Sequence, residues 1–295
     1  MSTNINIQEV EYQIGNLAVR GISCGEKQDN IVLCLHGWLD NAASFQPLLP
    51  YLTNKQVIAI DLLGHGFSAH RSLDAHYHFI DWVYDLLQLF TQNNWPEIDI
   101  VGHSMGAMIA SAFASAFPEK VKSLTLIDSI GFISTEKKQT TTQLRRGLLS
   151  RLRAKQLTSA NTKNKGYPTL DAAIKARVMV SDLSFGQAKL LVQRGIVKEN
   201  GLYSWRADKR LNIISPYRLS LEQAQQLIED INCPVLLVYA TAGLDIVSTG
   251  IKHFAPLFKN LQIKELNGGH HVHMQQPVQT ATLINQFIHK QNNNS

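Results

Sequence analysis

The segment Gly102-His103-Ser104-Met105-Gly106 has the pattern G-x-S-x-G, which can present a serine hydroxyl for nucleophilic attack. It lies between an apolar run at residues 98–101, typical of a strand, and an alanine-rich run at residues 107–117, typical of a helix. Glycines on both sides permit a strained turn and close packing of the helix on the strand. The helix N-terminus supplies backbone N–H groups and a partial positive charge where an oxyanion would form. This context predicts acyl-transfer chemistry at Ser104.

The rest of the chain alternates between strand-like and helix-like segments. Residues 7–14 and 17–25 predict an antiparallel pair that turns at Gly15-Asn16. Short apolar runs predict further strands at residues 31–35, 57–60, 98–101, 121–127, 235–239 and 261–266. Helical spacing of apolar residues predicts helices at residues 42–52, 81–90, 107–117 and 278–289. Such alternation predicts an α/β fold, with a mostly parallel sheet and helices on both faces.

The alternation stops between about residues 131 and 218, where the sequence has helical stretches but no strong strand. We therefore expect a core domain made of residues 1–131 and 219–295, with a helical cap domain inserted at residues 132–218. The chain of 295 residues is long enough for both.

Composition excludes several classes of protein. No stretch approaches 18 consecutive apolar residues, and the first ten residues lack the apolar segment of a secretory signal. Cys24, Cys34 and Cys233 lie far apart in apolar surroundings, which favours buried reduced thiols over disulfides or a metal site. We expect no membrane insertion and a cytoplasmic location. No pattern in the sequence indicates an oligomeric state.

The net charge of +5 comes from one segment. Residues 132–165 contain nine basic residues and one acid, Glu136, whereas the remainder contains 19 basic and 22 acidic residues. The nine are Lys137, Lys138, Arg145, Arg146, Arg151, Arg153, Lys155, Lys163 and Lys165. No nucleic-acid-binding motif accompanies them, so we expect no nucleic-acid partner.

Leucines at 144, 148 and 152 recur at four-residue spacing within this basic segment, which predicts an amphipathic helix with a solvated charged face. A positive rim that attracts an anionic substrate or acyl carrier is a second interpretation. Contact with an anionic membrane surface is a third.

Three more motifs accompany the serine turn. They are His36-Gly37-Trp38-Leu39, Asp61-Leu62-Leu63-Gly64-His65-Gly66-Phe67-Ser68 and Gly269-His270-His271-Val272-His273. With these motifs the chain resembles the α/β-hydrolases over nearly its whole length. The first motif continues into Asp40-Asn41, and the set is similar to the serine hydrolase-like proteins, a branch related to esterase-like hydrolases. The resemblance implies the α/β-hydrolase fold, with an eight-stranded sheet and a helical cap.

The resemblance also implies roles for the serine and one histidine. Ser104 would be the nucleophile, and a neutral hydroxyl needs a base to accept its proton. His270 matches the family's Gly-His pair, whereas a one-residue slip would make His271 the base. His273 is interpreted as a neighbour packed near the triad. No carboxylate or cysteine ligand accompanies these histidines, so we expect no metal and no cofactor.

The sequence indicates the triad acid less directly than the serine and the histidine. In this superfamily it commonly lies nine residues after the proline that opens the seventh strand, which from Pro234 reaches Gly243. Glycine cannot serve, and Asp245 could serve only in a longer loop. Some members carry the acid after the sixth strand, where this chain has Asp128. We expect Asp128, with Asp245 as the alternative acid and backbone capping as the alternative role of Asp128.

The oxyanion hole is expected to consist of the backbone N–H groups of Trp38 and Met105. Trp38 and His103 are expected to line the substrate pocket, although a core position is an equal interpretation for Trp38. His36 is expected to hold its loop by hydrogen bonds. The segment 61–68 lacks the lysine and spacing of a phosphate loop, so a structural role is expected there.

Together these features predict a cofactor-independent serine hydrolase that cleaves small or medium carboxylic esters through an acyl-enzyme. A serine at the turn argues against haloalkane dehalogenases and epoxide hydrolases, which use aspartate there. A thioesterase, a lipase, a C–C bond hydrolase and an acyltransferase share the same triad, and fold alone does not separate them. A protein that senses a ligand with a retained triad is the alternative outside enzymes.

Overall fold

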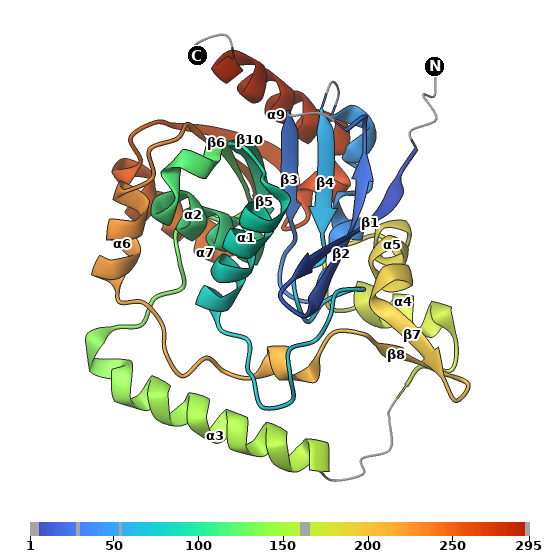
Figure 1. Cartoon of the computed structure of the whole chain (residues 1–295). Helices are drawn as coiled ribbons and strands as arrows, with labels where there is room; N and C mark the ends of the chain where they lie inside the picture. The colour runs from blue at the N-terminus through green and yellow to red at the C-terminus, as the bar shows by residue number, and fades with distance from the viewer. Residues whose placement is uncertain (1–5, 28–29, 53–54, 160–165, 293–295) are drawn as a thin grey trace.

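The computed structural model describes residues 6–27, 30–52, 55–159 and 166–292, and its centre is a sheet with the strand order β1-β2-β4-β3-β5-β6-β9-β10 (Figure 1). These strands are β1 (Gln8–Ile14), β2 (Leu17–Cys24), β3 (Ile31–Leu35), β4 (Gln56–Ile60), β5 (Ile98–His103), β6 (Val121–Ile127), β9 (Val235–Ala242) and β10 (Leu261–Gly269). β1 and β2 pair antiparallel, β2 is antiparallel to β4, and the strands from β4 to β10 run parallel. The prediction of a mostly parallel eight-stranded sheet is confirmed.

Both faces of the sheet are covered because its central strands are apolar on both sides. Every residue of β3 and β5 is buried. On one face α1 (Phe79–Asn93), α2 (Met105–Ala116), α6 (Leu221–Glu229) and α7 (Asp245–Phe254) contribute to the core. On the other, α9 (Pro277–Asn292) packs with the segment around Phe45 and Leu48. This two-sided arrangement is the predicted α/β-hydrolase fold (Figure 1).

One predicted helix of the core is wrong. Residues 42–52 form two short 3-10 helices, η1 (Ala42–Phe45) and η2 (Leu49–Tyr51), instead of one α-helix. Pro47 and Pro50 lie in this stretch, and each lacks the backbone N–H that a continuous helix requires.

Between β6 and α6 the chain leaves the sheet, and we call residues 132–218 the cap. It contains α3 (Thr140–Ser159), α4 (Leu170–Val178), α5 (Phe185–Gly195) and the hairpin of β7 (Ile196–Glu199) and β8 (Leu202–Trp205). The sequence shows no strong strand in this segment and predicts a helical cap, so this short hairpin was missed. Asn200-Gly201 connects the two strands with positive φ at both residues, which is the sequence signal of a tight hairpin. Lys163 and Lys165, the last two residues of the basic segment, lie outside the described residues.

The parallel strands bring four of the residues singled out by the motifs to one edge of the sheet. His36, Ser104, Asp128 and His270 are each the first residue after a strand, namely β3, β5, β6 and β10. Because these strands are parallel, their carboxyl ends meet at the same edge. In the described part of the chain, no helix has the length and apolar character needed to cross a membrane.

Candidate active site

Ser104 occupies a strained turn between β5 and α2. Its backbone has φ 51° and ψ −116°, a region that L-residues rarely adopt. The Ser104 N–H donates to the Ile127 carbonyl at 3.1 Å, which fixes the turn to the end of β6. The turn is tight because neither flanking glycine has a side chain. A Cβ at Gly106 would overlap the Leu35 carbonyl, and one at Gly102 would overlap the backbone of Ala107.

His270 pairs with Asp128. The Nδ1 of His270 lies 2.7 Å from Oδ2 of Asp128, whose side chain is fully buried. The other carboxylate oxygen accepts the Ala240 N–H at 3.0 Å, so β9 orients the carboxylate toward the imidazole. This geometry assigns the proton of the imidazole to Nδ1 and leaves Nε2 free to accept one.

Asp245 has a different environment. It is the first residue of α7, and it is exposed to solvent. The spacing rule reached position 243, and the structure explains why a glycine stands there: a Cβ at Gly243 would overlap the Asp128 carboxylate. Asp128 therefore fills, from the end of β6, the space beside position 243.

The loop after β3 lies against the serine turn. A Cβ at Gly37 would be 3.3 Å from the Cβ of Ser104, so the backbone of this loop approaches the nucleophile closely. Met105, on the other side of Ser104, is the first residue of α2. The backbone N–H of Met105 thus lies at the positive end of a helix. Both backbone groups predicted for an oxyanion hole belong to segments that adjoin Ser104.

His36 holds this loop in place. The Leu62 N–H donates to its Nε2 at 3.0 Å, and its Nδ1 lies 2.7 Å from the Gly37 carbonyl. Nε2 is therefore an acceptor and Nδ1 carries the proton, which makes the ring neutral. Burial lowers the pKa of His36, despite an opposing contribution from the hydrogen bond to Gly37.

The segment 61–68 has a structural arrangement. The Asp61 carboxylate accepts the N–H groups of Ala42 at 2.7 Å and Phe67 at 2.8 Å. It also accepts the Nε of Arg194 from the cap at 2.9 Å. The segment therefore joins the loop after β3 to α5 of the cap.

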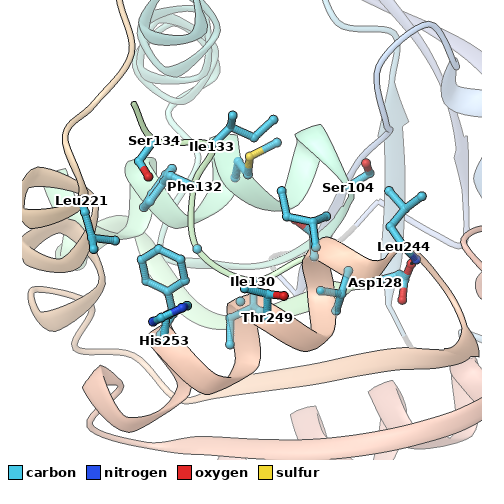
Figure 2. Close-up of a pocket in the computed structure, with 17 residues that line it drawn as sticks. Ser104, Asp128, Ile130, Phe132, Ile133, Ser134, Leu221, Leu244, Thr249 and His253 are labelled. Atoms are coloured by element: carbon cyan, nitrogen blue, oxygen red, sulfur yellow. The ribbon is translucent and has the colours of Figure 1, made fainter. Parts of the chain in front are cut away.

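A cavity of about 380 Å³ extends from Ser104 (Figure 2). Its lining residues come from the serine turn, from the start of the β6–α3 connection and from α7. They are Ser104, Met108, Asp128, Ser129, Ile130, Gly131, Phe132, Ile133, Ser134, Leu221, Leu244, Ile246, Val247, Thr249, Gly250, His253 and Phe254. Figure 2 shows Ser104, Asp128 and Leu244 at one end and Leu221, Phe132 and His253 at the other. The cavity is lined mainly by apolar side chains, as a site for an aliphatic group would be.

Neither Trp38 nor His103 is among the residues that line this cavity. Trp38 is 49% exposed, and its indole N–H donates to the Leu211 carbonyl of the cap at 3.3 Å. His103 is fully buried, with its Nε2 2.9 Å from the His270 carbonyl. The expectation that His103 lines the pocket does not fit its position, since its ring packs beneath the histidine loop. Burial and the neighbouring His273 keep the pKa of His103 well below its usual value.

A second histidine pairs with carboxylates that the sequence did not suggest. His271 contacts Asp182 of the cap, and its Nε2 lies 3.2 Å from Oδ2 of Asp40. His273 is fully buried, and its ring centroid lies 4.3 Å from that of His103. Burial lowers the pKa of His273 to about 3, so this ring is neutral. Within the described residues, no group of three or more His, Cys, Asp or Glu side chains is arranged to hold a metal ion.

The fold and the site together define an α/β-hydrolase: a strained serine before a helix and a carboxylate-paired histidine meet at the carboxyl edge of this sheet. The family model of the alpha/beta hydrolase fold matches residues 30–277, and the chain belongs to that family.

Several known proteins are similar to this chain over most of its length. The "Serine hydrolase-like protein" of Danio rerio is 30% identical over 282 residues, which cover 92% of this chain and 86% of that protein. A hypothetical protein of Pseudomonas aeruginosa PAO1, solved by crystallography, has a TM-score of 0.88 at 33% identity and covers 95% of this chain and 98% of its own. The thioesterase domain from the curacin biosynthetic pathway has a TM-score of 0.79 at 25% identity, with coverage of 95% and 99%. These relatives support a hydrolase of the serine hydrolase-like kind.

Proposed function

We propose that this protein is a serine hydrolase that cleaves carboxylic esters of small or medium acyl groups through an acyl-enzyme. The observation that carries the proposal is the 2.7 Å contact between His270 Nδ1 and the buried Asp128, at the edge of the sheet where Ser104 opens into an apolar cavity. The similarity to serine hydrolase-like proteins supports the same class of chemistry.

In the proposed mechanism, Ser104 Oγ attacks the ester carbonyl while His270 Nε2 accepts its proton. Asp128 holds the proton on Nδ1 and stabilises the imidazolium that forms. The backbone N–H groups of Trp38 and Met105 donate to the oxyanion of the tetrahedral intermediate. His270 then gives its proton to the departing alcohol, and in the second half of the reaction it activates the water that releases the acid.

The cavity supports an aliphatic acyl or alcohol group as the part of the substrate that is recognised. Its volume of about 380 Å³ lies near the lower end of the range for small-molecule sites. Besides Ser104, Asp128 and His253, its polar lining side chains are those of Ser129, Ser134 and Thr249. A small or medium acyl group fits this volume and lining better than a bulky polar one.

A thioester is the second candidate substrate. The curacin thioesterase domain matches 95% of this chain at 25% identity, and thioesters react through the same acyl-enzyme. The two substrate classes differ in the leaving group and share the acyl pocket, so they are separated by direct comparison of matched acyl groups.

Hydrolysis of p-nitrophenyl esters of increasing acyl length tests the proposal, with acyl-thiocholine esters of the same lengths beside them. We expect Ser104→Ala to abolish turnover and Asp128→Asn to lower kcat by about 10⁴-fold, because the asparagine supports the wrong imidazole tautomer. Asp245→Asn is the matched control and should stay within about twofold of wild type, because Asp245 is an exposed helix-start residue.

Two results would contradict the proposal in different ways. A larger loss in Asp245→Asn than in Asp128→Asn would move the acid to α7. Wild-type turnover no higher than that of Ser104→Ala on every ester and thioester would favour a ligand-sensing protein with a retained triad.

A further inference from the structure

The imidazole of His271 lies between two carboxylates, next to the proposed base. Its Nδ1 contacts Oδ1 of Asp182, and its Nε2 is 3.2 Å from Oδ2 of Asp40. An ionised carboxylate only accepts hydrogen bonds, so both ring nitrogens must carry protons and the ring is an imidazolium. Burial opposes this charge, but the hydrogen bonds to Asp182 and Asp40 outweigh it and raise the pKa of His271 to about 9.

The groups around His271 come from three separate parts of the chain. Asp40 ends the turn that contains Trp38, and its N–H donates to the Gly37 carbonyl at 3.1 Å. Asp182 belongs to the cap, between α4 and α5, and its Oδ2 also accepts the backbone N–H of His271 at 2.9 Å. The cluster therefore connects the proposed oxyanion turn, the loop of the proposed base and the cap.

Arg177 and Gln275 complete the cluster. Arg177, in α4 of the cap, donates to Oδ1 of Asp40 at 2.6 Å. Gln275 donates to the Asp182 carbonyl at 2.8 Å, while its own carbonyl accepts the Gly269 N–H at 2.7 Å. The residue immediately before His270 is thus tied to the same carboxylate-bearing loop of the cap.

The cluster is charged but balanced. Two cations, His271 and Arg177, face two anions, Asp40 and Asp182, so the sum is zero beside the His270 ring, whose centroid is 5.3 Å from that of His271. The titratable groups that face His271 from the packed elements are Asp182 and Arg177 of the cap, Asp40 after β3, His103 of β5, and His270 and His273 of its own loop. Such a cluster can fix geometry without adding a net charge that would oppose protonation of the base.

We propose that His271 is a positioning residue for the reaction proposed above, on which this inference rests. As an imidazolium it holds the loop of His270 against the turn that presents the Trp38 N–H, and it fastens both to the cap through Asp182. Loss of this link shifts the base relative to Ser104 and the oxyanion hole. Because misplacement of about 1 Å can cost on the order of 10² in rate, the effect falls mainly on kcat.

The test compares three full-length variants with wild type in ester hydrolysis, with kcat and KM measured separately. His271→Gln and Asp182→Asn break the link, whereas Gln187→Ala removes a different bond between the cap and the same loop, from Gln187 Nε2 to the Met274 carbonyl at 2.8 Å. We expect kcat to fall about tenfold or more in the first two, with KM within about twofold. Gln187→Ala should change neither constant by more than about twofold.

The pH profile supplies a readout that loosened packing does not move. In wild type, kcat/KM should fall with an apparent pKa near 9 as His271 loses its proton, after subtraction of the Ser104→Ala background. In His271→Gln this alkaline fall should be absent. Circular dichroism checks folding. If His271→Gln does not fold, Asp182→Asn, whose side chain is 27% exposed in wild type, takes its place. Its kcat should fall by the same factor, and its alkaline fall should move to lower pH, because His271 loses one of the two carboxylates that hold its proton.

Each remaining outcome overturns a specific proposal. Wild-type kcat and an unchanged alkaline fall in His271→Gln would refute the positioning role alone. Equal losses in His271→Gln and Gln187→Ala would assign the effect to general attachment of the cap. Absence of wild-type turnover above Ser104→Ala, together with no labelling of Ser104 by a fluorophosphonate probe, would overturn the proposed function and this role with it.

Discussion

The two halves of the cap are attached to the core by different kinds of contact. The half from α4 to β8 uses charged groups with little exposure: Arg177 with Asp40, Asp182 with His271, and Arg194 with Asp61. The half formed by α3 contacts the core through a partly buried hydrogen bond, from Arg151 Nη2 to His78 Nε2 at 2.9 Å. Its Ser150 Oγ accepts the Ile214 N–H at 3.1 Å, a bond within the cap itself. Figure 1 shows the corresponding separation, with α4 and α5 at the right of the view and α3 along the bottom.

The outer surface of α3 reflects this looser attachment. Leu144, Leu148, Leu149 and Leu152 are between 41% and 55% exposed, and Arg145, Arg146 and Arg153 are exposed as well. The buried positions of α3 include Gln143 and Gly147, and a Cβ at Gly147 would overlap Pro216 of the cap itself. The α4–β8 half is therefore built into the geometry of the site, whereas α3 presents a surface that can change without disturbing that geometry.

The largest expected effect comes from removing Arg194. Its Nε donates to Asp61 at 2.9 Å and its Nη1 to Glu9 at 2.6 Å, and the Asp61 side chain is fully buried. We expect Arg194→Met to lower the free energy of unfolding by about 3–5 kcal/mol, because it leaves a buried carboxylate without its cation. Urea denaturation measures this change.

Arg153→Met, on the exposed face of α3, is the matched control and should change the free energy of unfolding by less than about 0.5 kcal/mol. Similar losses in the two variants would remove the distinction between the halves of the cap.

The second expected effect is a pH-dependent contribution of His271 to stability. Its pKa is raised from 6.5 to about 9 in the folded protein, so its stabilisation is complete below pH 6.5 and is lost as pH rises through 9. The corresponding linkage free energy is about 3 kcal/mol at most. The difference in unfolding free energy between wild type and His271→Gln should therefore be larger at pH 6 than at pH 10. A difference that is constant with pH would mean that His271 contributes packing alone.

Much of the site could be predicted because it depends on strand ends. The residues after β3, β5, β6 and β10 follow apolar runs that are visible in the sequence, and parallel strands bring their carboxyl ends together. The signals missed in the fold were also local: Pro47 and Pro50 in the expected helix, and Asn200-Gly201 in the hairpin of the cap.

Asp128 was expected as the partner of His270 only through the resemblance, with Asp245 as the alternative. The choice between these two acids and the cluster around His271 needed three-dimensional information. Counting from Pro234 gave Gly243, and only the pairing of β6 with β9 reveals that Asp128 fills the space beside that glycine. Asp182 lies 89 residues from His271 in sequence, in a cap whose path back to the core no periodicity specifies. Contacts of this kind depend on how two separately patterned segments pack.

A smaller effect is expected from the contact between Arg151 and His78. Burial and the nearby Arg151 charge lower the pKa of His78, so Arg151→Gln should raise that pKa toward its ordinary value. The cost in unfolding free energy should stay below about 1 kcal/mol, because this contact is only partly buried. Proton NMR titration of His78 in wild type and Arg151→Gln measures the shift. An unchanged pKa would mean that α3 does not rest on His78 in solution.

The smallest expected effect concerns the charge of α3. If its arginines attract anionic substrates, Arg145→Glu combined with Arg146→Glu should lower kcat/KM for a p-nitrophenyl hemisuccinate by about threefold at low salt, while the butyrate ester stays unchanged. The loss should disappear near 0.5 M salt, where the Debye length falls to about 4 Å. Lys264→Glu combined with Lys290→Glu makes the same change of net charge in β10 and α9 and is the control. If kcat/KM for each ester is the same in all variants, the basic face is a solvated surface and substrate choice is left to the cavity beside Ser104. A loss of kcat/KM that is confined to the anionic ester and to the α3 variant would give the exposed half of the cap a function of its own.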